Sequence, residues 1–186
     1  MSQKSRAVIL SGERGTGKST LCIKLAKKIR GTGGIVSPGL FDSSGSKIGF
    51  DCLDVISGDS WELGRVRAAY LDDDRCGGSG EGGTGKYLFD KTGVLRAVAA
   101  IRDSIGRAGG TTLIDEIGPL EFRGGGFAPV LPLLAAAPDL IIVVRPGLIE
   151  KLLPVVPVHH VRVFYLTELN RGMLEGEIVS FLKGSN

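Results

Sequence analysis

A short run near the start of the chain carries residue types suited to holding a polyphosphate. It matches the pattern G-x-x-x-x-G-K-[ST] in full. The glycines let several backbone N–H groups turn toward one anion, and a following helix would present its positive N-terminus to the same place. Lys18 adds a point charge for the β- and γ-phosphates, and the Ser19 hydroxyl is an oxygen ligand suited to Mg²⁺. The residues predicted to contact a nucleotide here are Gly12, Glu13, Arg14, Gly15, Thr16, Gly17, Lys18, Ser19 and Thr20.

The flanking residues support this interpretation over a chance match in a glycine-rich chain. An apolar strand is predicted at 6–11, and an amphipathic helix is predicted at 19–30. A second stretch, 80–87, has the same spacing but ends in Tyr87 in place of Ser or Thr. It follows a polar loop and precedes a strand-like segment. We therefore expect a phosphate-binding loop at the first run alone.

An acidic pair follows a second apolar strand, Thr111–Ile114. Asp115 is in the place of a Walker B aspartate, where it would hold Mg²⁺ through water. Glu116 is placed to orient the water that attacks the γ-phosphate in a hydrolysis. The alternative is that Glu116 caps a turn or pairs with a cation. Glu121 could serve the metal's water or fix a loop, and the sequence favours neither.

Hydrolysis of a phosphoanhydride also needs cations for the charge that develops in the transition state. Arg145 ends the predicted strand Leu140–Val144, at the edge of a parallel sheet where ligands bind. Lys86 borders a glycine-rich loop and could close over phosphates. Arg65 and Arg123 are weaker candidates. A surface or structural role is as open as a catalytic one for each of them.

The segment after the last predicted strand contains Asn170 and Arg171. An amide can hydrogen-bond a nucleobase, and a guanidinium can stack on it. We predict these contacts with the base. The competing interpretation is that Thr167 or Asn170 caps the final helix.

Strands alternate with helices along the chain, which favours an α/β fold: a mainly parallel sheet flanked by helices, in one domain over residues 1–186. Residues from about 35 to 90 fit this alternation poorly, and we predict inserted strands and hairpins with a glycine-rich loop at 77–85. Glycines 31, 33 and 34 are expected to end the first helix. A helix is predicted at 127–137, although two prolines limit its regularity.

Charge and composition narrow the partners. The net charge is only +3 over 186 residues, so a strongly basic nucleic-acid surface is absent. No apolar run reaches the length of a membrane span. The three cysteines form no C-x-x-C pair, which indicates free thiols. We expect a cytoplasmic monomer whose partners are nucleoside triphosphates and not a membrane. The weak net charge disfavours nucleic acid as a partner without excluding it.

Five short sequence blocks follow one another along the chain: 12–19, Gly49-Phe50-Asp51, Gly85-Lys86-Tyr87, 115–121, and Thr167 with Asn170-Arg171. With these blocks the chain resembles the thermophile-type nucleoside-triphosphatases, a family that includes the cancer-related nucleoside triphosphatase of animals. The resemblance covers nearly the whole chain. Its most specific parts are the Asp-Glu-Ile-Gly block and the Asn-Arg pair.

This resemblance implies a RecA-like P-loop core and slow, Mg²⁺-dependent hydrolysis of ATP, GTP and other triphosphates to diphosphate and phosphate, with loose base selectivity. It implies the same roles for Lys18, Ser19, Asp115 and Glu116, and it strengthens Lys86 as a catalytic candidate. The stretch Gly77–Gly85 is longer than the family pattern.

Two other functions remain open on the sequence. A small-molecule or nucleotide kinase could use the same core, but it would need an arginine-rich lid, and the stretch 77–85 contains no arginine. An NTP-dependent module that binds RNA or a protein could use turnover as a timer, but the weak net charge argues against RNA. Hydrolysis is therefore the expected activity.

Overall fold

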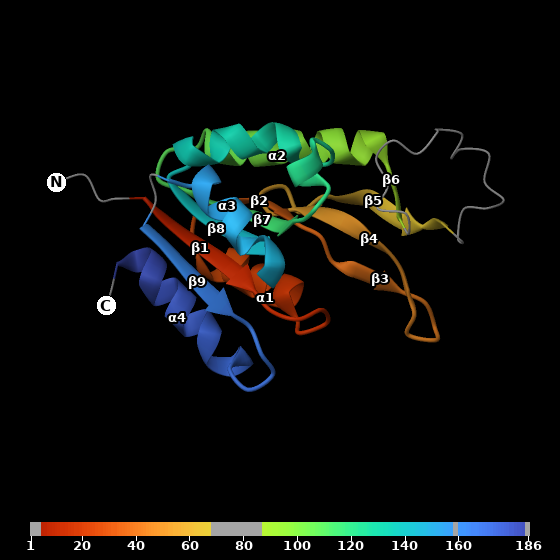
Figure 1. Cartoon of the computed structure of the whole chain (residues 1–186), viewed down its shortest axis with the longest axis horizontal. Helices are drawn as coiled ribbons and strands as arrows, with labels where there is room; N and C mark the ends of the chain where they lie inside the picture. The colour runs from red at the N-terminus through yellow and green to blue at the C-terminus, as the bar shows by residue number, and fades with distance from the viewer. Residues whose placement is uncertain (1–4, 68–86, 158–159, 185–186) are drawn as a thin grey trace.

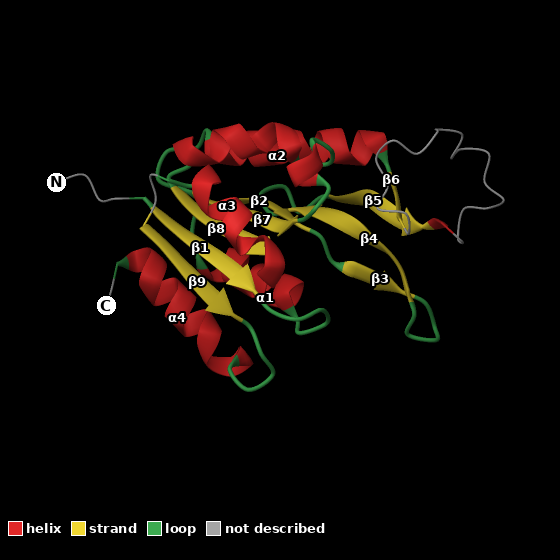
Figure 2. Ribbon diagram, viewed as in Figure 1, coloured by secondary structure: helices red, strands yellow, loops and turns green. Residues whose placement is uncertain are grey.

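The computed structural model describes residues 5–67, 87–157 and 160–184. Within them, strands join in one mixed sheet of order β6-β5-β4-β2-β7-β8-β1-β9, with β3 paired to β4, and helices cover both faces (Figures 1 and 2). The strands are β1 (Arg6–Ser11), β2 (Thr32–Val36), β3 (Gly39–Phe41), β4 (Lys47–Asp54), β5 (Ser60–Val66), β6 (Tyr87–Phe89), β7 (Thr111–Ile117), β8 (Asp139–Val144) and β9 (His160–Tyr165). The helices are α1 (Lys18–Lys28), α2 (Lys91–Ile105), α3 (Ile149–Leu152) and α4 (Arg171–Lys183), with short 3₁₀ helices η3 (Glu121–Arg123), η4 (Ala128–Ala136), η5 (Pro146–Leu148) and η6 (Leu153–Val155).

The parallel part of the sheet consists of β2, β7, β8, β1 and β9. Parallel strands are buried on both faces, which is why β1 and β8 are continuous apolar runs. Strand β8 lies between β1, which leads into the phosphate loop, and β7, which carries the acidic pair. Both strands end at the same edge of the sheet, so the two motifs meet there. The expected fold class, a mainly parallel sheet flanked by helices, is confirmed.

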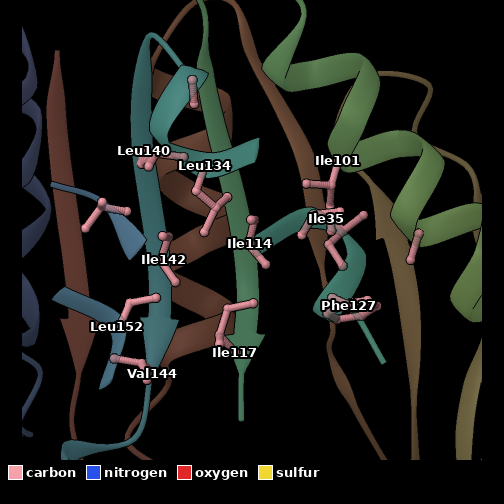
Figure 3. Packing of buried hydrophobic residues seen from close by; sticks show 14 of the residues in the cluster. Ile35, Ile101, Ile114, Ile117, Phe127, Leu134, Leu140, Ile142, Val144 and Leu152 are labelled. Carbon is pink, nitrogen blue, oxygen red and sulfur yellow. The ribbon is translucent and has the colours of Figure 1, made fainter. Parts of the chain in front are cut away.

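Two apolar layers hold this part together. On one face, α2 and η4 pack on the sheet, and Figure 3 shows Leu140 and Ile142 of β8 beside Ile114 of β7, with Ile101 of α2 nearby. On the other face, α1 and α4 cover Val8, Leu113 and the neighbouring strands. Each of these side chains is buried, so the sheet that positions the site is fixed from both sides.

The remaining strands, β3 to β6, form an antiparallel extension beyond β2. Ile35 and Val36, which the sequence placed with the inserted strands, belong instead to β2 and run parallel to β7. Trp61 anchors the extension to α2: its Nε1 donates to the Gly93 carbonyl at 2.9 Å, and the Arg96 guanidinium lies 4.2 Å from its ring centre. The tryptophan therefore has a packing role.

Two local predictions were wrong in detail. Gly33 and Gly34 do not end the first helix but lie in β2. Gly34 has a left-handed φ of +96°, and a Cβ there would collide with the Leu113 backbone of β7. The strand therefore needs glycine for close approach. The predicted helix at 127–137 is the 3₁₀ helix η4, because Pro132 inside it removes an N–H donor.

The cysteines and helices add two further facts. Cys22 and Cys52 are free and buried, and burial raises the pKa of the Cys52 thiol to about 12. Cys76 lies outside the described residues. Among the helices of the described ranges, none combines the length and the apolar character needed to cross a bilayer.

Candidate active site

The loop between β1 and α1 is bent by its glycines. Gly15 and Gly17 have φ angles of +83° and +93°, and Gly17 stands at the N-cap of α1. Such left-handed conformations are costly for residues with a Cβ. Gly12 lies against the Leu166 carbonyl, which a Cβ would strike. The loop therefore has the tight turns and the helix N-terminus that a phosphate cradle requires.

Lys18 is folded back over this loop. Its Nζ donates to the carbonyl oxygens of Gly12 at 2.7 Å and Glu13 at 2.6 Å. Burial lowers the pKa of Lys18 below its ordinary value of 10.5, and the nearby charges of Glu116, Asp115 and Glu13 oppose that shift. Phosphate oxygens, being charged acceptors, can take the place of the two neutral carbonyls.

Asp115 joins the acidic strand to the phosphate loop. The Ser19 hydroxyl hydrogen-bonds its carboxylate, and the Ser37 amide donates to Oδ2 at 3.2 Å. The side chain is 3% exposed. Burial raises the pKa of Asp115 to about 6, and the bond from Ser19 opposes that rise. Ser19, the residue after the lysine of the phosphate loop, therefore interacts with a buried carboxylate of β7.

Glu116 is the next residue along β7 and faces a cation. Arg145, directly after β8, donates from Nε to Glu116 Oε1 at 2.6 Å. Their side chains are 65% and 38% exposed, so the pair lies at the surface of the site. The pairing between β7 and β8 shifts by one residue at this point, between Asp115 and Ile117. This irregularity takes Glu116 out of the ladder, as at many active-site bulges.

Glu121 fixes the loop that follows. It accepts hydrogen bonds from the amides of Gly118 at 2.7 Å and Phe127 at 3.3 Å, and it is buried. Burial raises the pKa of Glu121 above its ordinary value of 4.5, although these bonds oppose the shift. Of the two roles left open by the sequence, the structure displays the loop-fixing one.

The donor set suits a hydrated Mg²⁺. Ser19 and Asp115 supply oxygen atoms in contact with each other, beside the loop that would hold the phosphates. Mg²⁺ keeps several waters and takes further oxygens from a bound polyphosphate, so few protein ligands are needed. Ser37 Oγ, next to Asp115 in this arrangement, is a buried hydroxyl for which the described residues provide no hydrogen-bond partner.

A comparison with protein families places this geometry in context. A family model described as NTPase matches residues 7–179.

The chain belongs to this NTPase family.

Members of the NTPase family resemble the chain over almost its full length. It is similar to the nucleoside-triphosphatase THEP1 of Archaeoglobus fulgidus, with 26% identity over 95% of this chain and 99% of that one. It is 32% identical to the Pyrococcus abyssi protein of the same name, over 91% and 88% of the two chains. The solution structure of a human cancer-related nucleoside triphosphatase superposes with a TM-score of 0.71 at 26% identity, covering 98% of this chain and 100% of that one. The resemblance deduced from the sequence blocks is thus confirmed.

Asn170 and Arg171, both predicted to contact the nucleobase, are placed differently in the structure. Arg171 lies with its guanidinium against Gly17, so it is next to the phosphate loop. Asn170 is engaged locally: Oδ1 accepts from the Thr167 amide at 2.9 Å, and Nδ2 donates to the Tyr165 carbonyl at 2.7 Å. Its side chain makes no capping bond to α4. Lys86 and the stretch 77–85 lie outside the described residues.

One of the weaker cation candidates, Arg65, lies away from the phosphate loop in the antiparallel extension. Arg65 is bonded to Asp51 at 2.7 Å and lies 3.3 Å from Glu62 within the extension, which is a structural role. Thr16 closes the phosphate loop by donating to the Glu13 carbonyl at 2.9 Å.

Sequence reasoning missed two features of the site. Arg14 donates to the Tyr87 hydroxyl at 3.0 Å, which joins the phosphate loop to strand β6 of the extension. Ser37 contributes its amide to Asp115. The second could have been anticipated, because Ser37 follows an apolar run and parallel strands end at one edge of the sheet. Nothing in the spacing of Arg14 and Tyr87 indicates that they meet.

Proposed function

We propose that this protein hydrolyses nucleoside triphosphates, ATP and GTP among them, to the diphosphate and phosphate with the help of Mg²⁺. The observation that carries the proposal is the contact between Ser19 and Asp115, with Glu116 the next residue along β7. The contact brings the phosphate loop next to two oxygen ligands for a metal, Ser19 and Asp115, and next to the Glu116 carboxylate. Membership of the NTPase family supports the same activity.

In the proposed reaction, the backbone amides at the start of α1 and the Lys18 ammonium bind the β- and γ-phosphates. Ser19 and Asp115 hold Mg²⁺, which would supply charge neutralisation across those phosphates. Arg171, whose guanidinium lies beside Gly17, would bind the nucleotide next to the phosphate loop. The triphosphate is then held with its γ-phosphate toward Glu116.

Glu116 would orient a water molecule for in-line attack on the γ-phosphorus and take its proton. The new P–O bond forms to the water oxygen, and the bond between the γ-phosphorus and the β-γ bridging oxygen breaks. The diphosphate leaves with that oxygen. A carboxylate offers two oxygens, so the bond from Arg145 uses only part of the acceptor capacity of Glu116. Arg145 can then face the developing charge on the transferred group.

The experiment that tests this proposal measures phosphate release from several triphosphates, with and without Mg²⁺ and with no added acceptor. Glu116→Gln should retain nucleotide binding, while turnover falls by about a hundredfold or more. Glu177→Gln, at an exposed position of α4, controls for the lost charge. Near-normal turnover of Glu116→Gln would remove the carboxylate from the mechanism. Phosphate transfer that requires an added acceptor would indicate a kinase instead.

A further inference from the structure

Ser37 lies immediately after β2, the strand that pairs with β7. Its amide donates to Asp115 Oδ2 at 3.2 Å. Its hydroxyl oxygen is buried and has no hydrogen-bond partner among the described residues. The hydroxyl is three bonds from that amide nitrogen, so it is close to the Asp115 carboxylate as well.

A buried hydroxyl without a partner is uncommon, because burial removes its hydrogen bonds to water and nothing replaces them. Other buried serines of the chain obey the rule. Ser11 Oγ donates to the Val144 carbonyl at 2.8 Å, and Ser104 Oγ lies 2.9 Å from Thr112 Oγ1. Ser37 thus departs from the pattern at the one carboxylate that would hold the metal.

We propose that Ser37 is a positioning residue for the hydrated Mg²⁺ held by Ser19 and Asp115. Its hydroxyl accepts a hydrogen bond from a water of the ion's hydration shell, while its amide orients the Asp115 carboxylate. This inference rests on the proposed function, since it needs the metal to bind there. Mg²⁺ retains several waters, and groups that bind such waters raise metal affinity.

The position of Ser37 fits this role better than a contact with the nucleotide alone. Asp115 accepts from Ser19 of the phosphate loop and from Ser37, which follows β2. These two segments are far apart in the sequence. A hydrated ion at that carboxylate is therefore bordered by both serines. A water bound to Mg²⁺ donates through its hydrogen atoms, and the serine hydroxyl oxygen can accept such a bond.

The test uses the full-length protein with a nucleoside diphosphate and Mn²⁺ as the metal probe, followed by electron paramagnetic resonance. Ser37→Ala should weaken Mn²⁺ binding about tenfold, the lower range for loss of such a partner. The affinity for the diphosphate in EDTA should stay at the wild-type value. If Ser37 had only a structural role, its loss would weaken diphosphate binding in EDTA as well. Ser37→Thr, which keeps the hydroxyl, should restore Mn²⁺ affinity. Ser104→Ala is the matched buried control and should bind Mn²⁺ like the wild type.

Wild-type Mn²⁺ affinity in Ser37→Ala would overturn the inference while leaving the proposed function intact. A Ser37→Thr protein as weak as Ser37→Ala would overturn it also, and this variant decides the matter if the alanine protein does not fold. Failure of the wild-type diphosphate complex to bind Mn²⁺ would instead overturn the proposed function.

Discussion

The parallel and antiparallel parts of the sheet differ in how fully they are enclosed. In the parallel part, Ala7, Val8, Ile9 and Leu10 of β1 are each 0% exposed, and β8 is buried along most of its length. In the antiparallel extension, most residues of β3, β4 and β6 are only partly buried. Parallel strands need cover on both faces, whereas antiparallel strands tolerate solvent on one. The phosphate loop and the acidic pair belong to the enclosed part.

The difference in burial means that the residues of the proposed reaction are held more firmly than those of the extension. The residues of the proposed reaction sit at the ends of strands that cannot shift without disturbing both apolar layers. The extension reaches the phosphate loop through the hydrogen bond between Arg14 and Tyr87. We therefore expect substitutions in the two parts to have effects of different size and kind.

The largest effect should come from cutting the parallel core. Ile142 is 0% exposed in β8, and Ile142→Ala should lower the free energy of unfolding by about 2–5 kcal/mol through lost contacts and a residual cavity. Ile48 in β4 is only partly buried, so Ile48→Ala should cost less than half as much. Urea denaturation of both variants measures this. Equal losses would contradict the difference in packing between the two strands.

The next effect concerns Arg145, at the exposed margin of the enclosed part. If it stabilises the transferred group, Arg145→Ala should reduce turnover by about a hundredfold, the lower range for loss of one well-placed donor. Arg107→Ala, at an exposed position two residues after α2, is the matched control. A rise in turnover would mean that Arg145 mainly restrains Glu116. Steady-state phosphate release distinguishes the two outcomes.

Glu121 gives a pH-dependent effect in the enclosed part. Because its pKa in the folded protein is raised by burial, the folded state holds this proton more tightly than the unfolded state. Its contribution to stability is complete below the ordinary pKa of 4.5 and is lost as pH rises through the folded pKa. The unfolding free energy of Glu121→Gln should therefore decline less than that of the wild type above pH 4.5. Urea titrations at a series of pH values test this, and parallel curves would contradict it.

The smallest effect is expected where the extension meets the phosphate loop. Tyr87→Phe removes the hydroxyl that accepts from Arg14 and should raise KM for the triphosphate by about two- to fivefold, the value of one modest hydrogen bond. A double-mutant cycle with Arg14→Ala isolates the coupling. Additive effects would show that the bond carries no coupling between the extension and the loop.

The parallel half was largely predictable from sequence. Continuous apolar runs of strand length, ended by Gly12 or by Asp115, identify buried strands and the edge where their ends meet. The prediction that Arg145 lies at the edge of the sheet where ligands bind followed from the same rule, and at that edge it forms an ion pair with Glu116. Those inferences use local pattern and topology, which buried parallel strands express strongly.

The extension was less predictable because partly exposed antiparallel strands have weaker periodicity. Inserted strands were predicted over residues 35–90 without their bounds, and the structure shows that Lys47–Asp54 is one of them. The closure of a short turn by a side chain was not predictable either. The Asn170 side-chain amide accepts one hydrogen bond and donates another within the turn from Tyr165 to Asn170. The sequence of this turn contains no glycine, so it gave no signal for such a tight turn.

The place of β8 has a consequence for how the protein is made. Synthesis delivers β1 and β7 first, yet the strand that belongs between them comes later in the chain. A ribosome-bound chain that ends after β7 already contains both phosphate motifs but lacks the spacer that sets their separation. Nucleotide binding at these motifs would therefore require the complete sheet. A triphosphate present during translation would then stabilise the folded chain relative to shorter intermediates.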